Sequence, residues 1–272
     1  MIPKYAITEW NEFVPWHEEV QVEQDLLISR ALVAIYQDDY LASHLAFRGG
    51  TALHKLYLHP QPRYSEDIDL VQLEAGPIKE TYDHLRDTLD FLGEPKVKQK
   101  KHNNTLIFRV QSQGVPPLPI HLKVEINCKE HFGVLPMVRQ PFEVNSMWFK
   151  GRAELLTYQL DELVGTKFRA LYQRRKGRDL YDLYKVLTST EVDIDRVIRC
   201  YRQYMAFVVE HSPTYKEYVL NMEEKMQDDE FLGDTKNLLR KGEGFNPIEG
   251  YEIVKTKLID RLNPESNENL KL

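Results

Sequence analysis

The chain has 272 residues, 42% of them hydrophobic, and a formal net charge of −6. This length allows one large domain or two small ones, each with a buried core. The acidic balance excludes binding of nucleic acid through a globally positive charge, although a local basic face can still bind RNA. The two cysteines have no metal-binding spacing and fit a reducing compartment. No apolar run approaches the roughly 20 residues of a membrane helix, and the N-terminus lacks a signal pattern, so we expect a soluble, cytoplasmic protein.

The first half of the chain mixes helical and strand-like patterns of apolar residues. A strand ends in the turn at Gly49-Gly50, and a hairpin turn is predicted at Asn103-Asn104. The elements predicted here, in chain order, are a helix over 18–40, a short helix over 51–57, a strand over 65–71, a helix over 77–92, and strands over 97–101, 105–111, 119–127 and 142–150.

After about residue 152 the apolar spacing becomes helical throughout. The predicted helices cover 160–173, 178–187, 194–210, 215–241 and 249–262. We therefore predict the α+β class, with an α+β domain over 1–151 and a helical domain over 152–272 that completes a cleft with it.

Two aspartates in the strand over 65–71 are candidates for a metal site. Residues two apart in a strand share a face, so Asp67 and Asp69 point the same way while Ile68 and Leu70 point into a core. Adjacent carboxylates repel each other unless a cation lies between them, and oxygen ligands of this kind suit Mg²⁺ together with substrate phosphates. The upstream Gly49-Gly50-Thr51 turn and the start of the following helix offer backbone N–H groups to phosphates. This combination favours nucleotidyl transfer.

A third carboxylate lies on the strand predicted over 119–127. Leu122, Val124 and Ile126 alternate there with polar residues, and Glu125 is on the polar face. If this strand pairs beside Asp67–Val71, Glu125 completes a three-carboxylate site for two metal ions. Otherwise Glu125 is an ordinary exposed strand residue.

A block of six cations within twelve residues follows in the helical half: Lys167, Arg169, Arg174, Arg175, Lys176 and Arg178. Lys167, Arg174 and Arg178 would share one helix face, unless a break near Gly177 separates the last of them. Such residues suit a triphosphate, because the arginine fork grips phosphate with two hydrogen bonds. The alternatives are a solvated basic face or ion pairs with Asp179 and Asp182.

The motifs together resemble known families. Gly49-Gly50-Thr51, Asp67-Ile-Asp69 and Val124-Glu125-Ile126 are similar to the signature of the DNA polymerase β-like nucleotidyltransferase superfamily, with a longer spacer between Gly50 and Asp67. Arg63-x-Ser65-x-Asp67-Ile-Asp69-Leu70 and the block over 167–184 resemble the AbiEii/AbiGii toxin family. These are nucleotidyltransferase-like toxins of bacterial toxin–antitoxin and phage-defence systems, and they include the MenT toxins. The resemblance covers roughly residues 45–188.

The resemblance implies a nucleotidyltransferase-type mixed sheet with flanking helices, followed by a C-terminal helical bundle. It implies Mg²⁺ or Mn²⁺ as cofactor, an NTP as substrate, an RNA acceptor (the 3′ end of tRNA) whose modification blocks translation, and a cognate antitoxin as partner. The implied metal ligands are Asp67, Asp69 and Glu125. The implied catalytic residues are these three with Lys167 and Asp179, and the implied nucleotide- and phosphate-binding residues are Arg48, Gly49, Gly50, Thr51, Arg63, Ser65, Arg174 and Arg178.

Several alternatives stay open from the sequence. The same residues would serve nucleotidyl or phosphoryl transfer to a protein hydroxyl, or a nucleotide-binding module that acts through a partner. Arg48 and Arg63 either contact phosphate or pair with Glu66 or Glu74. Asp182 is interpreted as structural, holding Arg178. The lysines at 96, 98, 100 and 101 either contact an RNA backbone or guard a sheet edge against aggregation.

Overall fold

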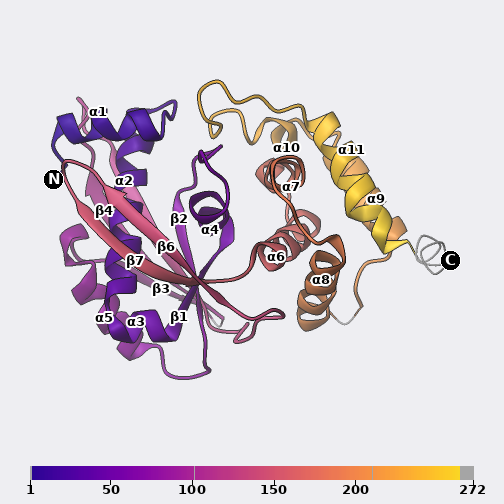
Figure 1. Ribbon diagram of the computed structural model, residues 1–272, viewed down its shortest axis with the longest axis horizontal. Helices are drawn as coiled ribbons and strands as arrows, with labels where there is room; N and C mark the ends of the chain where they lie inside the picture. Colours follow the sequence, from indigo (N-terminus) through magenta and orange to yellow (C-terminus); the bar gives the residue numbers. More distant parts are fainter. Residues whose placement is uncertain (1, 101, 210, 264–272) are drawn as a thin grey trace. The chain divides into compact units, whose positions relative to one another are not determined.

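The computed structural model describes residues 2–100, 102–209 and 211–263 (Figure 1). The chain forms two compact units: the first runs to Tyr158 and takes in Arg240–Gly242, and the second begins at Gln159. The return of Arg240 to the first unit is fixed by its backbone N–H, which donates to the Pro62 carbonyl oxygen at 2.8 Å. Its guanidinium donates to the Phe13 carbonyl oxygen at 2.9 Å.

The first unit is built on a seven-stranded mixed sheet with strand order β3-β4-β5-β2-β1-β7-β6. Two neighbouring pairs, β2 with β5 and β1 with β7, are parallel, and the other pairs are antiparallel. The strands are β1 (Leu45–Arg48), β2 (Asp67–Gln72), β3 (Lys96–Lys100), β4 (Asn103–Gln111), β5 (Pro119–Asn127), β6 (Val138–Asn145) and β7 (Lys150–Thr157).

One face of this sheet is the core of the unit. Apolar side chains from alternate positions are fully buried there, including Ile68 and Leu70 of β2 and Val124 of β5, and α2 (Glu19–Gln37) packs against this face. In Figure 1, α2, α3 (Asp39–His44) and α5 (Lys79–Thr88) lie together on this side of the sheet. On the opposite face, β2 and β5 carry polar side chains that are partly exposed, among them Asp67, Asp69 and Glu125. We call it the open face.

The remaining elements of the first unit are short. They are α1 (Lys4–Phe13), α4 (Gly49–Leu56) and the 3₁₀ turn η1 (Asp90–Leu92). The sequence pattern did not predict α1. The helix predicted over 18–40 is divided instead, because the Asp38 carboxylate accepts a hydrogen bond from the Leu41 N–H at 2.8 Å and starts α3.

Three predictions along the strands are corrected. The region predicted as one strand over 142–150 contains the end of β6 and the start of β7, and a turn around Ser146 joins these two strands. The helical region does not begin at 152, because β7 continues to Thr157, whose hydroxyl donates to the Phe47 carbonyl oxygen at 2.7 Å. Asn103 and Asn104 belong to β4 and not to the hairpin turn. Lys101, predicted at the end of the preceding strand, lies outside the described residues.

The second unit consists of helices, as predicted. They are α6 (Leu160–Gln173), α7 (Gly177–Ser189), α8 (Ile194–Val208), α9 (Tyr215–Lys225), α10 (Asp229–Gly233), α11 (Pro247–Lys257) and the 3₁₀ turn η2 (Ile259–Leu262). Phe168 stacks on Tyr218 in the core, with ring centroids 4.7 Å apart. Side-chain caps on Asp193, Thr214, Asp228 and Asn246 begin four of these helices, because each cap satisfies N–H groups of a first turn. The predicted α+β class is therefore confirmed. Within the described ranges, no helix has the length and apolar character needed to cross a membrane.

Candidate active site

Three carboxylate-bearing positions meet on the open face of the sheet. β2 pairs in parallel with β5, and the register sets Asp69 beside Glu125 and Asp67 beside Lys123. The two strands therefore pair side by side, which was the condition set for Glu125. Because neighbouring strands lie about 4.8 Å apart, the backbones of Asp69 and Glu125 are direct neighbours and their side chains lie on the same face of the sheet.

The Asp67 carboxylate is partly buried and is repelled by the charges of Asp69 and Glu66. Its Oδ1 is buried and accepts no hydrogen bond, although it lies 3.3 Å from the Lys123 ammonium nitrogen. The pKa of Asp67 is raised to about 6: burial is the largest cause, Lys123 opposes it, and the charges of Asp69 and Glu66 add to it. The site therefore holds more negative charge than the local cations offset.

A divalent cation fits this donor set. Oxygen ligands from paired carboxylates are what Mg²⁺ and Mn²⁺ prefer, and the buried Asp67 Oδ1 lacks the hydrogen bond that buried polar atoms normally have. In the described conformation Lys123 offsets Asp67, and the Asn103 amide donates to Glu125 Oε2 at 3.2 Å. Across the described ranges, no three acidic, histidine or cysteine side chains converge closely enough to hold a metal ion.

The glycine turn closes the site from β1. Arg48 ends β1 and α4 begins at once with Gly49, whose φ is +81°. A Cβ at Gly49 would lie 2.1 Å from Asp69 Oδ2, so only glycine allows the backbone to approach this carboxylate. The first N–H groups of a helix have no partner within the helix. The turn therefore presents donors beside the carboxylates, as a phosphate site requires.

Thr51 and Ser65 tie this turn to β2. The Thr51 hydroxyl is buried, 2.8 Å from the Ser65 hydroxyl and 2.5 Å from the Asp67 carbonyl oxygen. We predicted both residues to bind phosphate. This stays a prediction, and in the structure the Thr51 hydroxyl holds the turn, Ser65 and the Asp67 strand together.

The two arginines that flank the motif also make internal contacts. The Arg48 guanidinium pairs with Glu130 at 2.5 Å, a partner other than the two acids predicted for it. Arg63 is buried and donates to the Tyr64 carbonyl oxygen at 2.7 Å. Arg48 lies opposite Asp69 in the β1–β2 register, so it is the arginine that stands next to the carboxylates.

The basic block of the second unit forms a buried ion cluster around Asp179. The Lys167 Nζ lies 3.0 Å from Asp179 Oδ1 and 2.9 Å from Asp182 Oδ2. Arg174 grips Asp179 with two hydrogen bonds of 2.6 and 2.7 Å. Burial acts to raise the pKa of Asp179, but Lys167 and Arg174 outweigh it and hold that pKa below its ordinary value. The ion-pair interpretation is therefore confirmed for Lys167 and Arg174.

The members of this cluster differ in accessibility. Both carboxylates are fully buried and Lys167 is 7% exposed, whereas the Arg174 side chain is 54% exposed. Arg174 is therefore the cation of the cluster that an external anion reaches most easily. Arg178 contacts Asp234 at 3.7 Å, and it follows Gly177 at the start of α7.

The comparisons with known proteins show the family and the fold. The sequence matches the family described as nucleotidyl transferase AbiEii toxin, Type IV TA system, over residues 30–256. The chain belongs to this family. AbiEii proteins are nucleotidyltransferase toxins by that description, so the motifs on the open face lie within a matched nucleotidyltransferase region.

Solved structures show the same fold. MenT4, a nucleotidyltransferase toxin from Mycobacterium tuberculosis H37Rv, is 18% identical with a TM-score of 0.67, covering 98% of this chain and 93% of its own. JHP933 from Helicobacter pylori is 16% identical with a TM-score of 0.53, covering 93% of this chain and 97% of its own. No curated protein sequence matches this AbiEii family member.

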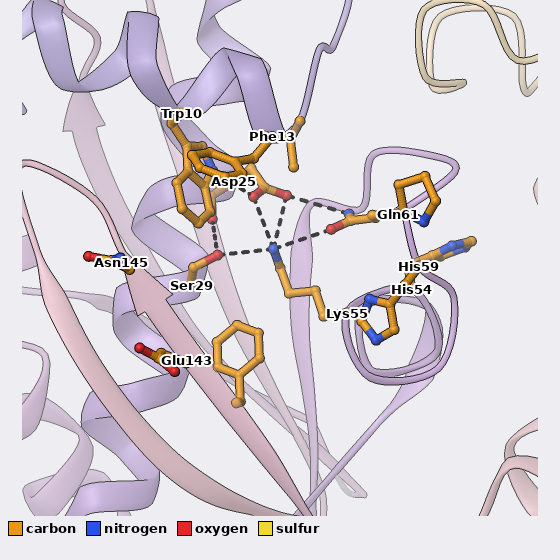
Figure 2. Close-up of a pocket in the computed structure, with 13 residues that line it drawn as sticks. Trp10, Phe13, Asp25, Ser29, His54, Lys55, His59, Gln61, Glu143 and Asn145 are labelled. Atoms are coloured by element: carbon orange, nitrogen blue, oxygen red, sulfur yellow. Dashed lines mark hydrogen bonds and ion pairs between the residues drawn. The ribbon is translucent and has the colours of Figure 1, made fainter.

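Sequence reasoning missed a second polar cluster in the first unit. Asp25 of α2 and Lys55 of α4 form a buried ion pair, with the Lys55 Nζ 3.0 Å from both carboxylate oxygens of Asp25. Figure 2 shows this pair with Ser29 and Gln61 at a pocket of about 490 Å³. The Trp10 Nε1 also donates to Asp25, at 3.0 Å. This pair joins α4, which begins at Gly49, to α2. The residues are far apart in sequence, and no local pattern links them.

We expect Asp25→Ala to destabilise the protein strongly, because it leaves the Lys55 ammonium buried without its counter-charge. Breaking a buried ion pair in this way costs about 3–5 kcal/mol. Urea denaturation measures the free energy of unfolding. The double variant Asp25→Leu/Lys55→Met should recover most of the loss, and Asp83→Ala, which breaks an exposed pair with Lys79, should change stability little. A single variant as stable as the wild type would show that the pair does not hold α4.

Proposed function

We propose that this AbiEii-family toxin transfers a nucleotide from an NTP to an RNA acceptor, the 3′ end of tRNA, with Mg²⁺ or Mn²⁺, and so blocks translation. The observation that carries the proposal is the register of β2 with β5, which sets Asp69 beside Glu125 on the open face, next to the Gly49 turn. Paired carboxylates beside free helix N–H groups suit a triphosphate and its metal ions.

The reaction joins an acceptor hydroxyl to the α-phosphorus of the NTP. The hydroxyl oxygen forms a bond to that phosphorus, the bond to the oxygen that bridges the α- and β-phosphates breaks, and pyrophosphate leaves. Glu125 takes the hydroxyl proton as general base. A bound divalent cation would stabilise the charge on the attacking and leaving oxygens, held by Asp67, Asp69 and Glu125.

The phosphates are assigned to backbone and arginine donors. The N–H groups of Gly49, Gly50 and Thr51 hold the β- and γ-phosphates. From the second unit we assign Arg174 to the triphosphate, because its guanidinium is half-exposed and Asp179 fixes its orientation. Lys167 and Asp179 then act as positioning residues, through their ion pairs with Asp182 and Arg174. We assign Arg48, Arg63 and Arg178 to phosphate with lower priority, since each is less exposed than the Arg174 side chain.

The proposal extends to the setting of the reaction. We propose that it takes place in the cytoplasm, where tRNA and NTPs are found, and that a cognate antitoxin counteracts it. The family description names a toxin–antitoxin system of Type IV, which supports the antitoxin.

The test is turnover with Mg²⁺, total tRNA and each of the four NTPs, labelled at the α-phosphate and, in parallel, at the γ-phosphate. We expect α-label, and no γ-label, to enter RNA with one preferred NTP. Label in a polypeptide from the α-phosphate would change the acceptor to a protein hydroxyl, and label from the γ-phosphate would change the reaction to phosphoryl transfer. If no label is transferred under any condition, the enzyme proposal is wrong and a binding module that acts through a partner replaces it.

A further inference from the structure

The register of the sheet sets the edge strand β3 level with the carboxylates. Lys98 of β3 pairs with Thr105 of β4, which pairs with Glu125, which pairs with Asp69. Since paired residues point to the same side of a sheet, the Lys98 side chain shares the open face with the carboxylates. Lys96 and Lys100 lie two residues before and after it, so they share this face as well.

These three residues, which we call the β3 lysine row, form an exposed and uncompensated line of charge. All three are exposed, and within the described residues none takes part in an ion pair. The positions of β4 opposite them are Ile107, Thr105 and Asn103, all uncharged. The row therefore keeps its positive charge, which distinguishes it from Lys123 beside Asp67.

We propose that the β3 lysine row binds the phosphodiester backbone of a single-stranded RNA acceptor close to its reacting end. The inference rests on the proposed function, because it takes the hydroxyl of that RNA as the nucleophile. With strands about 4.8 Å apart, the row lies roughly 10 Å from the Glu125 strand and roughly 14 Å from the Asp69 strand. These distances correspond to a few nucleotides, so the row contacts phosphates next to the reacting nucleotide.

The spacing along β3 also suits an extended polynucleotide. Residues two apart in a strand are about 6.7 Å apart, which is comparable with the separation of successive phosphates in an extended single strand. An RNA end that approaches Asp67, Asp69 and Glu125 carries the same sign of charge as they do. Three lysines on its path offset that repulsion and add the salt-dependent attraction that is typical of phosphate contacts.

Protection of the sheet edge is the competing explanation. β3 is an edge strand, and lysines on such strands discourage pairing with another chain. This role does not require the lysines to share a face with the carboxylates, nor their charge to be left free. The two explanations predict different results when charge is removed and polarity is kept.

The experiment compares the wild type with Lys96→Gln/Lys98→Gln/Lys100→Gln, which removes the charge and keeps a polar edge. Affinity for a fluorescent single-stranded oligoribonucleotide is measured by anisotropy without metal, over a range of salt concentrations. We expect affinity at low salt to fall on the order of tenfold. Each lost phosphate contact should lower the slope of log K against log salt by roughly 0.7, so the loss of three should lower it by about 2. The KM for the NTP should not change.

Two controls complete the design. Lys96→Arg/Lys98→Arg/Lys100→Arg keeps the charge and should bind RNA as the wild type does. Lys4→Ala/Lys79→Ala/Arg86→Ala removes the same charge from the exposed surface of α1 and α5 and should leave RNA affinity and salt slope close to those of the wild type.

The outcomes separate this inference from the proposed function. If the glutamine variant has the affinity and salt slope of the α1/α5 control, or if the wild type does not bind the oligoribonucleotide, the inference is wrong. Aggregation of the glutamine variant with unchanged RNA affinity would assign the row to edge protection. If RNA binding is lost in the glutamine variant while the wild type transfers no nucleotide, the β3 lysine row binds RNA and the proposed reaction is wrong.

Discussion

Asp69→Asn should abolish nucleotide transfer and leave the fold intact. The variant removes one of the carboxylates assigned to the cation and keeps the size of the side chain beside Gly49. Metal-ion stabilisation of a transition state is worth several kcal/mol, and each 1.36 kcal/mol is tenfold in rate. We therefore expect kcat/KM to fall by at least about a thousandfold. The measurement is transfer of α-labelled nucleotide at several Mg²⁺ concentrations.

Stability provides the matching control for this variant. Burial raises the pKa of Asp67, and the Asp69 charge raises it further, so ionised Asp67 destabilises the folded state at neutral pH. Removal of the Asp69 charge relieves part of this repulsion, and the free energy of unfolding should stay equal or rise. The exposed variant Asp83→Asn should keep full activity. Transfer within tenfold of the wild type in Asp69→Asn would remove this carboxylate from the proposed site.

Lys167→Met should destabilise the second unit more than any exposed substitution. It leaves Asp179 and Asp182, both fully buried, with the partly exposed Arg174 as the remaining cation of the cluster. An uncompensated charge of this kind costs about 3–5 kcal/mol. Urea denaturation measures the loss, and hydrogen exchange of α6 and α7 shows that it is local to the cluster.

The pH dependence of this loss has a definite sign. The pKa of Asp179 is held below its ordinary value of 3.8 in the folded wild type. Its ionised form therefore stabilises the fold above that value, and this contribution disappears as the pH falls through the lowered pKa. Without Lys167, burial dominates and the pKa rises, so protonation favours the folded variant. The difference in stability between wild type and Lys167→Met should be largest at neutral pH and should shrink as the pH falls toward 4.

A second substitution tests whether the cluster acts as one unit. Lys167→Met/Asp182→Leu should recover part of the stability, because it removes a buried charge together with its partner. A loss in the double variant equal to the sum of the two single losses would show that the residues act independently, against the contacts of 2.9 and 3.0 Å.

The local patterns of the sequence were sufficient for most elements and for the chemistry of the motifs. Period-two alternation identified β5 with its polar face at Glu125, and helical spacing identified α6 with both its ends. The Arg63–Leu70 motif with its paired aspartates and the block over 167–184 carried the resemblance to the AbiEii/AbiGii toxin family, which the match over residues 30–256 confirms. Such features depend on neighbours in the chain, and therefore a single sequence contains them.

The element boundaries that were predicted wrongly depend on contacts with residues far away in the sequence. β7 continues past residue 152 because β6 and β1 pair with it. The sequence pattern did not predict α1, which packs on α2. The sequence likewise offered two interpretations of the basic block. The structure shows ion pairs of Lys167 and Arg174 with the buried Asp179 and Asp182, and contact of this block with a triphosphate stays a proposal.

The sequence alone thus identified the charged residues of the candidate site, whereas only the tertiary structure determined which of them are neighbours. The sequence alone places two carboxylates on one face of a strand, a third on another strand, and three lysines on a further one. The sheet order β3-β4-β5-β2 and its register set Lys98, Glu125 and Asp69 in one row on the open face. Strand register is a property of two chain segments at once, fixed by the burial of Ile68, Leu70 and Val124 on the core face, since a shift of one residue would turn these side chains to solvent.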